Sequence, residues 1–161
     1  MINENWDKEA LLFLKLSNEF GVRMLMVGGG AVNFHGYQRH SADVDFWIEM
    51  TDDNLSRLLL VLKEMGYEID VFPEAVKKQE QNISLKFSPV SMFIELITRF
   101  SIDKNFEDAY AESEVMTIEN EDIYRWRVLN YDDLILSKIK SGRPKDYLDI
   151  QELQKIKNNN L

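Results

Sequence analysis

The chain has 161 residues, of which 45% are hydrophobic, so it can bury one substantial core but leaves little room for two ordinary domains. We therefore expect a single domain over 1–161, with its core at about 22–100 and further strands and helices at about 115–157. The formal net charge of -9 argues against binding of duplex DNA through a broad basic face.

Composition also limits the metal chemistry and the location of the chain. There is no cysteine, so any metal site must use oxygen ligands or the two histidines. No apolar run approaches the roughly 20 residues that cross a bilayer, and the first residues do not resemble a signal peptide. We expect a cytoplasmic protein with no membrane partner.

Apolar spacing in the N-terminal part predicts a packing helix followed by a strand and a second helix. The first helix is predicted over 6–20 and ends at Gly21. A buried strand is predicted over 22–27, and a glycine triplet at 28–30 interrupts it. The second helix is predicted over 31–37.

The central part alternates strands with one helix. Acidic and apolar residues alternate over 43–48, which is typical of a strand. A helix over 51–65 is capped by Thr51. Two strands, over 83–87 and 92–97, are expected to form a hairpin around a turn that contains proline.

The C-terminal part predicts short strands at 115–118 and 126–129, and then helices over 130–140 and 145–157. The expected class is therefore α+β (α/β), with a mixed β-sheet flanked by helices and a C-terminal helical pair.

Asp43 and Asp45 are the first candidate functional residues. Alternate residues of a strand face the same way, so the two carboxylates project from one face about 7 Å apart, while Val44 and Phe46 face the core. Two like charges so close favour a hard divalent cation such as Mg²⁺, which prefers carboxylate oxygens and retains waters for substrate phosphates. The alternative is an edge strand with a solvated acidic face.

Gly28, Gly29 and Gly30 lie between a predicted strand and a predicted helix. Their backbone N–H groups could approach phosphate oxygens, or the triplet could be only a tight turn. A dinucleotide fingerprint is disfavoured, because Asn33 replaces its third glycine or alanine and the acidic strand follows too soon.

Glu95 is a third acid, within an otherwise apolar strand. A carboxylate there needs a partner or a function, since burying it alone is costly. It could pair with Arg99 or Lys86. If its strand lies beside the aspartate strand, it could instead complete a metal site and accept the proton of an attacking hydroxyl.

Three other residues are assigned to packing or to the surface. His35 and His40 lack the spaced partners of a metal site. Trp47 shares a face with the aspartates and could cover a base, although a large aromatic residue at the end of a half-buried strand is more often part of the core.

Together these motifs resemble the nucleotidyltransferase superfamily. The run Val27-Gly28-Gly29-Gly30-Ala31-Val32, then His35 to Asp45, is similar to the Gly-Gly-x-Ala and Gly-x-x-Arg-x-Thr/Ser-x-Asp-x-Asp signature of small bacterial members. These members include type IV toxin–antitoxin (AbiEii-like) nucleotidyltransferases and antibiotic nucleotidyltransferases for aminoglycosides and lincosamides.

The C-terminal part extends the resemblance to the toxin-like group. The segments 133–138 and 142–150 are similar to its Asp-Leu-x-x-x-Lys and Gly-Arg-x-Lys-Asp-x-x-Asp patterns. Ser41 stands where threonine is common and Glu95 where aspartate is common, and both keep the functional group. Longer antibiotic-modifying relatives often carry an additional helical domain for the acceptor, for which this chain has little room.

The resemblance implies roles for particular residues. Asp43, Asp45 and Glu95 would be catalytic and would hold Mg²⁺ or Mn²⁺. The nucleotide would be held by residues of the glycine turn, the loop after it and the C-terminal helices: Gly28, Gly29, Gly30, Arg39, Ser41, Lys138, Arg143, Lys145 and Asp146. Alternatively, Lys138 and Asp146 fasten two helices together, and Asp146 and Asp149 orient the basic residues.

The expected reaction is transfer of an NMP from an NTP to an acceptor hydroxyl with release of pyrophosphate. The acceptor is left open among RNA, protein and a small molecule, and a toxin-like enzyme would have a cognate antitoxin protein as partner. The alternatives are an antibiotic nucleotidyltransferase and a non-catalytic module of the same fold that binds a nucleotide or a partner.

Overall fold

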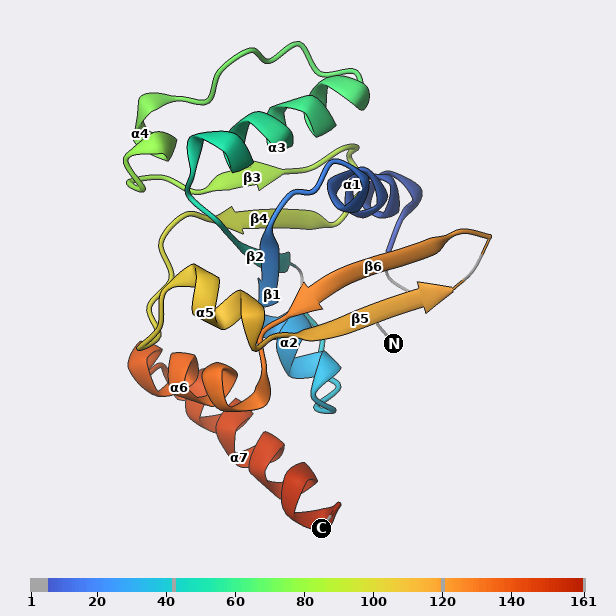
Figure 1. Cartoon of the computed structure of the whole chain (residues 1–161). Helices are drawn as coiled ribbons and strands as arrows, with labels where there is room; N and C mark the ends of the chain where they lie inside the picture. The colour runs from blue at the N-terminus through green and yellow to red at the C-terminus, as the bar shows by residue number, and fades with distance from the viewer. Residues whose placement is uncertain (1–5, 42, 120, 161) are drawn as a thin grey trace.

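The computed structural model describes residues 6–41, 43–119 and 121–160. Its strands are β1 (Met24–Val27), β2 (Asp43–Ile48), β3 (Ile83–Leu85), β4 (Phe93–Ile97), β5 (Glu114–Glu119) and β6 (Ile123–Val128). They form one six-stranded sheet in the order β3-β4-β2-β1-β6-β5 (Figure 1). The sheet is mixed, as predicted: β1 is antiparallel to β2 and parallel to β6, and β2 is parallel to β4.

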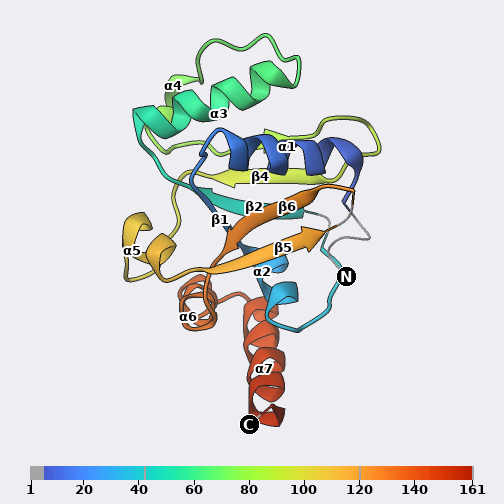
Figure 2. The same cartoon turned by 45° about the vertical axis from the view of Figure 1, so that its right-hand side comes forward.

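The helices lie around this sheet and at one end of it. They are α1 (Lys8–Glu19), α2 (Gly28–Phe34), α3 (Asp52–Glu64), α4 (Glu74–Lys77), α5 (Phe106–Ala111), α6 (Tyr131–Ser141) and α7 (Pro144–Asn159). α1 packs against β6 and α3, whereas α2 packs against β1, β2 and α6. α3 and α4 lie beside the β3–β4 edge, and α6 and α7 lie at the opposite end of the molecule (Figures 1 and 2).

Side-chain caps explain where several helices begin. Thr51 accepts a hydrogen bond from the Asn54 N–H at the start of α3, as the sequence predicts. Asn130 does the same for the Asp133 N–H at the start of α6. Each cap satisfies a backbone donor that has no partner within its helix.

Burial follows the predicted alternation in β2, where Val44, Phe46 and Ile48 are buried. All of β1 is buried, because it is a central strand covered on both faces. The antiparallel pairing of β1 with β2 also excludes the dinucleotide fold, which needs parallel neighbours around its glycine turn.

The structure corrects three expectations about the elements. α2 begins at Gly28 and not at Ala31, so the glycines form its first turn. α4 and α5 were not predicted, because helices of 4 and 6 residues are too short to display a helical period. β5 and β6 are both longer than predicted, since a two-stranded ribbon with exposed residues lacks the apolar signal of a core strand.

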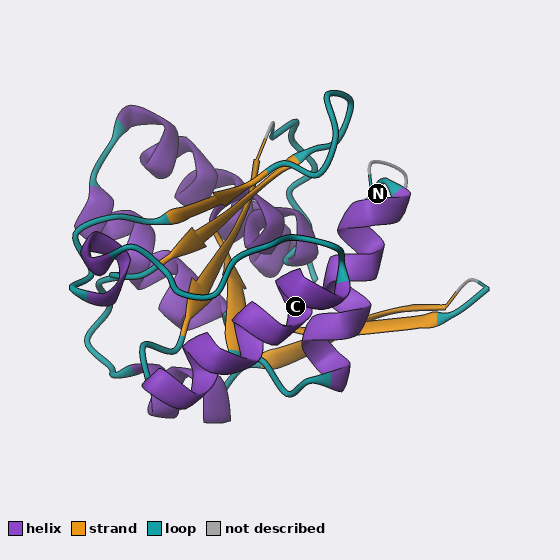
Figure 3. Cartoon of the chain, turned by 90° about the horizontal axis from the view of Figure 1, so that it is seen from above, coloured by secondary structure: helices purple, strands orange, loops and turns teal. Residues whose placement is uncertain are grey.

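The C-terminal pair forms as predicted. Gly142 ends α6 with a left-handed backbone (φ 63°), and Pro144 opens α7. Leu134 and Leu153 are fully buried where the pair meets the rest of the fold. Seen from above, the β5–β6 hairpin extends sideways beyond the helices (Figure 3). Within the described residues, no helix combines the length and apolarity needed to span a membrane.

Candidate active site

The parallel pairing of β2 with β4 brings the predicted acids together. Asp45 lies directly opposite Glu95, and Asp43 lies opposite Phe93. All four side chains therefore share one face of the sheet, because paired residues of neighbouring strands point the same way. We call Asp43, Asp45 and Glu95 the acidic row.

Asp45 is the most perturbed member of the row. Burial, and then the negative charges of Asp43 and Glu95, raise the pKa of Asp45 from 3.8 to about 6. The charges of Lys138 and Lys145 partly oppose this shift. The row therefore concentrates negative charge at a half-buried position, which a cation would stabilise.

Glu95 has a different partner from those considered in the sequence. Its Oε2 accepts a hydrogen bond of 2.6 Å from the Ser84 hydroxyl on β3. Among the described residues, Glu95 forms no ion pair with Arg99 or Lys86. The Glu95 carboxylate is therefore held by the neutral hydroxyl of Ser84.

The acidic row does not form a closed metal cage. Among the described residues, no three histidine or acidic side chains are grouped closely enough to hold a metal ion by themselves. Mg²⁺ is commonly bound by one or two carboxylates together with waters and substrate phosphates. The donor set of Asp43 and Asp45, with Glu95 beside them, fits that open kind of site.

The three glycines are each required for a different reason. Gly28 has a left-handed backbone (φ 57°), and a Cβ there would lie 2.6 Å from Asp45 Oδ2. A Cβ on Gly29 would meet Ser41 Oγ at 2.8 Å, and one on Gly30 would meet Met26 at 2.8 Å. Gly28 thus borders the acidic row, whereas Gly30 allows α2 to pack closely on β1.

Two side chains fasten the part of the α2–β2 loop that precedes the acidic strand. The Ser41 hydroxyl donates to the Asp43 carbonyl oxygen at 2.9 Å. Arg39 forms two hydrogen bonds to the Asp149 carboxylate on α7, from Nε at 2.8 Å and from its terminal nitrogen at 3.0 Å. Arg39 therefore joins the loop that precedes the acidic strand to the last helix.

Lys138 is a buried cation on α6, only 4% exposed. Its Nζ lies 2.9 Å from Asp149 Oδ2 and 3.4 Å from Asp146 Oδ1. Both carboxylates are themselves buried, so the group is a charged network inside the helix pair. Asp146 and Asp149 thus contact basic residues directly, and the nucleotide-binding role of Lys138 and Asp146 stays a prediction.

Arg143 stands at the start of α7 and is bound to Asp146 through both its backbone N–H and its guanidinium, at 3.0 and 2.8 Å. Burial opposes the charge of Asp146, but the hydrogen bonds from Arg143 and Ser141 and the charge of Lys138 outweigh it and hold the pKa of Asp146 well below its usual range. Asp146 therefore stays ionised and holds the side chains of Arg143 and Lys138 in place.

Asp45 lines one cavity, which adjoins a second, larger one. The smaller, of about 120 Å³, is lined by Asp45, Gly28 and the basic residues Lys138 and Arg143, among others. A larger cleft of about 520 Å³ includes Arg99 and Lys140. The two spaces share four lining residues, Ile97, Phe100, Ser137 and Ser141.

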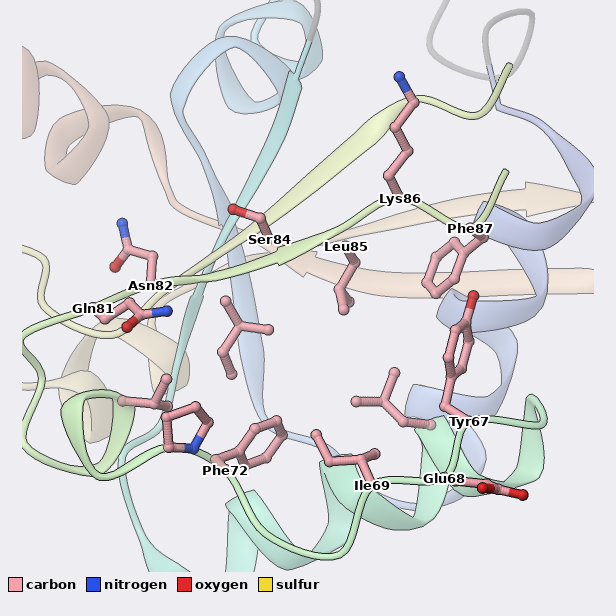
Figure 4. Close-up of a pocket in the computed structure, with 14 residues that line it drawn as sticks. Tyr67, Glu68, Ile69, Phe72, Gln81, Asn82, Ser84, Leu85, Lys86 and Phe87 are labelled. Carbon is pink, nitrogen blue, oxygen red and sulfur yellow. The ribbon is translucent and has the colours of Figure 1, made fainter. Parts of the chain in front are cut away.

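Other cavities do not contain this combination. Asp43 lines a separate space of about 40 Å³ together with Arg39 and Ser41. A cavity of about 420 Å³ between β3 and α3 is mainly apolar, and Leu85, Phe72 and Ile69 line it (Figure 4). Neither holds an acid beside Lys138 and Arg143.

The remaining aromatic and imidazole candidates have structural environments. Trp47 is 7% exposed and packs against Phe100 and Phe106, so it belongs to the core. His35 Nε2 lies 2.8 Å from the Leu129 carbonyl oxygen, and His40 is exposed.

A family model described as a nucleotidyltransferase of unknown function (DUF6036) matches residues 5–161. The chain belongs to this family. No curated protein matches the chain. The family places the chain among the nucleotidyltransferases, in agreement with its mixed sheet and flanking helices, and names no acceptor.

Several residues around the acidic row were not singled out from the sequence. Ser84 has no motif of its own, and only the pairing of β3 with β4 places it opposite Glu95. Ser137, Ser141 and Phe100 line the cavities beside Asp45. Ser137 and Ser141 lie within one helical turn of Lys138, and Phe100 lies just after β4. These positions along the chain could have been used to predict them.

Proposed function

We propose that this protein transfers a nucleoside monophosphate from an NTP to an acceptor hydroxyl and releases pyrophosphate. The observation that carries the proposal is the position of Asp45. It lies opposite Glu95 in the sheet and lines a cavity with Lys138 and Arg143. Acidic and basic side chains thus meet around one cavity, as binding of a polyphosphate with its cation requires.

The two adjoining cavities support the placement of the nucleotide. Lys138, Arg143 and the exposed Lys145 would contact the phosphates, since the charges of both lysines already act on Asp45. The 520 Å³ cleft has a volume suited to a small-molecule ligand, and Phe100 in its wall could contact a base. Phosphates would then lie beside the acidic row and the nucleoside in the cleft.

In the proposed reaction, the acceptor oxygen forms a bond to the α-phosphorus while the bond from that phosphorus to the bridging oxygen breaks. Glu95 would take the hydroxyl proton and later return it to solvent. Asp43 and Asp45, with Glu95 beside them, would hold Mg²⁺ or Mn²⁺, which would neutralise charge on the phosphate oxygens. Lys138 and Arg143 would stabilise the departing pyrophosphate.

The test is pyrophosphate release and label transfer from each of the four NTPs with Mg²⁺ or Mn²⁺, using mixed RNA, protein extract and small-molecule acceptors. We expect Asp45→Asn and Asp43→Asn to abolish both signals, because each removes a carboxylate charge from the row. Asp53→Asn, an exposed aspartate on α3 paired with Arg57, is the matched control and should keep full activity. Equal turnover by Asp45→Asn and the wild type would refute the proposal.

The same experiment addresses the non-catalytic alternative. If ATP–Mg²⁺ raises the melting temperature of the wild type but no acceptor ever releases pyrophosphate, the fold serves as a nucleotide-binding module. Transfer only to an aminoglycoside or lincosamide would instead support the antibiotic-modifying alternative.

A toxin-like role is a further part of the proposal, supported by the resemblance of 133–138 and 142–150 to the toxin-like group. Expression of the wild type should then arrest growth, and Asp45→Asn should not. Relief of the arrest by the product of a neighbouring gene would identify the antitoxin. Equal growth of cells that express either form, at equal protein levels, would exclude this role.

A further inference from the structure

The two ends of the acidic row differ in chemistry. Toward Ile97, the row borders the small cavity lined by Lys138 and Arg143, and this cavity adjoins the larger cleft. Toward Phe93, it borders an exposed aromatic ring, 42% accessible, in a sheet face that is otherwise polar here. Phe93 and Ile97 are four residues apart on β4, about 13 Å along the strand.

The side chain of Lys86, the residue after β3, lies over the Phe93 ring. Lys86 Nζ lies 4.5 Å from the centre of the Phe93 ring. Lys86 and Ser84 point to the same side of the chain, away from Leu85, which enters the cavity beneath (Figure 4). Ser84 in turn binds Glu95. The ring, the ammonium group and the proposed base therefore lie on one face.

The exposed Phe93 ring and the Lys86 ammonium group lie beside the acidic row, where a ligand of the site can reach both. A flat base can stack on phenylalanine, and every base has such a face. The ammonium group now above the ring would then be free to contact a phosphate of the same nucleotide. The pair thus has both features that recognise a nucleotide, a π surface and a positive charge.

The geometry of in-line displacement indicates whether the Phe93 end would bind the NTP or the acceptor nucleotide. The attacking oxygen and the leaving pyrophosphate lie on opposite sides of the phosphorus. If the pyrophosphate leaves toward Lys138 and Arg143, the acceptor must approach from the Phe93 end. This step depends on the proposed function.

We propose that Phe93 and Lys86 form the acceptor subsite, and that the acceptor is the terminal nucleotide of a single-stranded nucleic acid with a free 3′-hydroxyl. Phe93 stacks the terminal base and Lys86 contacts its phosphate. The hydroxyl proton passes to Glu95 as the oxygen bonds to the α-phosphorus, and pyrophosphate leaves at the other end.

The strongly acidic surface is compatible with this acceptor. A strand end held by one ring and one ammonium group needs no broad basic face, whereas a duplex does. The subsite should therefore show a weak dependence of binding on salt concentration, because few counterions are released.

The experiment measures binding separately from catalysis. A short single-stranded RNA, labelled with a fluorophore at its 5′ end, is titrated with the full chain and read by anisotropy, and a DNA of the same sequence forms a second arm. Phe93→Leu should weaken RNA or DNA binding about tenfold, because it keeps an apolar side chain but removes the flat ring. Phe93→Trp should retain binding, and Lys86→Ala should weaken it and reduce the salt dependence.

The matched control is Lys157→Ala, which removes a lysine that lies 4.2 Å over the ring of Tyr131 on the C-terminal helix pair. It should leave nucleic-acid binding unchanged. Stabilisation by ATP–Mg²⁺ is measured for every variant and should be equal to that of the wild type, since the NTP occupies the other end of the row.

Equal strand binding by Phe93→Leu and the wild type would overturn the subsite. NTP-dependent labelling of a protein or a small molecule, with no strand binding, would overturn the nucleic-acid acceptor but leave the proposed transfer reaction intact. Strand binding that depends on Phe93, without pyrophosphate release under any condition, would instead refute the proposed reaction and retain the subsite.

Discussion

The two charged regions of the site are built in opposite ways. The acidic row lies on strands, and burial, together with the negative charges of Asp43 and Glu95, raises the pKa of Asp45 to about 6. The basic residues of α6 and α7 are already bound to buried carboxylates, and the pKa of Asp146 is held low. The row therefore gains from a bound cation, whereas the basic residues of the helix pair are held in place by carboxylates before any ligand binds.

This difference suggests a division of labour. In the helix pair, ion pairs hold the charged side chains in place. In the acidic row, a bound ligand must balance the negative charge. Stability and function should consequently respond differently to changes in each region, and the following predictions test that contrast.

The largest expected effect on stability comes from Asp149→Ala. It removes the shared partner of Arg39 and Lys138 and leaves a buried lysine with only the Asp146 contact at 3.4 Å. We expect a loss of roughly 3–5 kcal/mol in the free energy of unfolding, measured by urea denaturation. Glu152→Ala is the control, because its pair with Lys155 is on the surface, and it should change stability by about 0.5 kcal/mol or less.

A double variant, Lys138→Met with Asp149→Leu, separates structural from functional roles. Replacing a buried ion pair by apolar residues often recovers stability. We expect the unfolding free energy of the double variant to lie between those of Asp149→Ala and the wild type. ATP–Mg²⁺ should not stabilise the double variant, because Lys138 is absent. Full ATP–Mg²⁺ stabilisation in this variant would show that Lys138 serves the fold alone.

Asp45→Asn should raise the free energy of unfolding, whereas Asp149→Ala should lower it. A carboxyl with a raised pKa in the folded state favours folding while it is protonated, and that contribution is lost as pH rises from 3.8 to about 6. Without divalent cations at neutral pH, Asp45→Asn should therefore be more stable than the wild type, by up to about 3 kcal/mol. The difference should shrink in thermal melts below about pH 4, and a variant less stable than the wild type at neutral pH would contradict it.

Gly28→Ala tests the contact between the glycine turn and the row. Gly28 and Gly66 both have positive φ (57° and 99°), but only at Gly28 would a Cβ meet Asp45. Backbone strain should cost each alanine variant about 1 kcal/mol in unfolding free energy. Gly28→Ala should also reduce nucleotide transfer, whereas Gly66→Ala should leave it unchanged; equal activities would mean that the turn does not position Asp45.

The smallest effect is expected from Mg²⁺ alone. Carboxylate ligands must be deprotonated, so Mg²⁺ should raise the melting temperature by a few degrees at about pH 7.5 and by less at about pH 5. Calorimetric scans of the wild type and Asp45→Asn in Mg²⁺ and in EDTA measure this. A shift that is independent of pH, or that survives in Asp45→Asn, would place the cation elsewhere.

Local patterns along the chain predict most of the elements and single out the three acids. Alternation in 43–48 predicts both the strand and the shared face of Asp43 and Asp45, because the period of two is a local property of extended backbone. Capping residues and glycines likewise marked the ends of α3 and α6, since these signals act within a few residues.

Which distant residues meet could be read only from the folded chain. The register of β2 with β4 places Glu95 beside Asp45, and the pairing of β3 with β4 supplies Ser84, which no local pattern encodes. The folding of α7 against the loop after α2 joins Arg39 to Asp149, which are 110 positions apart. Such contacts depend on strand order and helix packing, and these follow from burial of the whole core and not from any one segment.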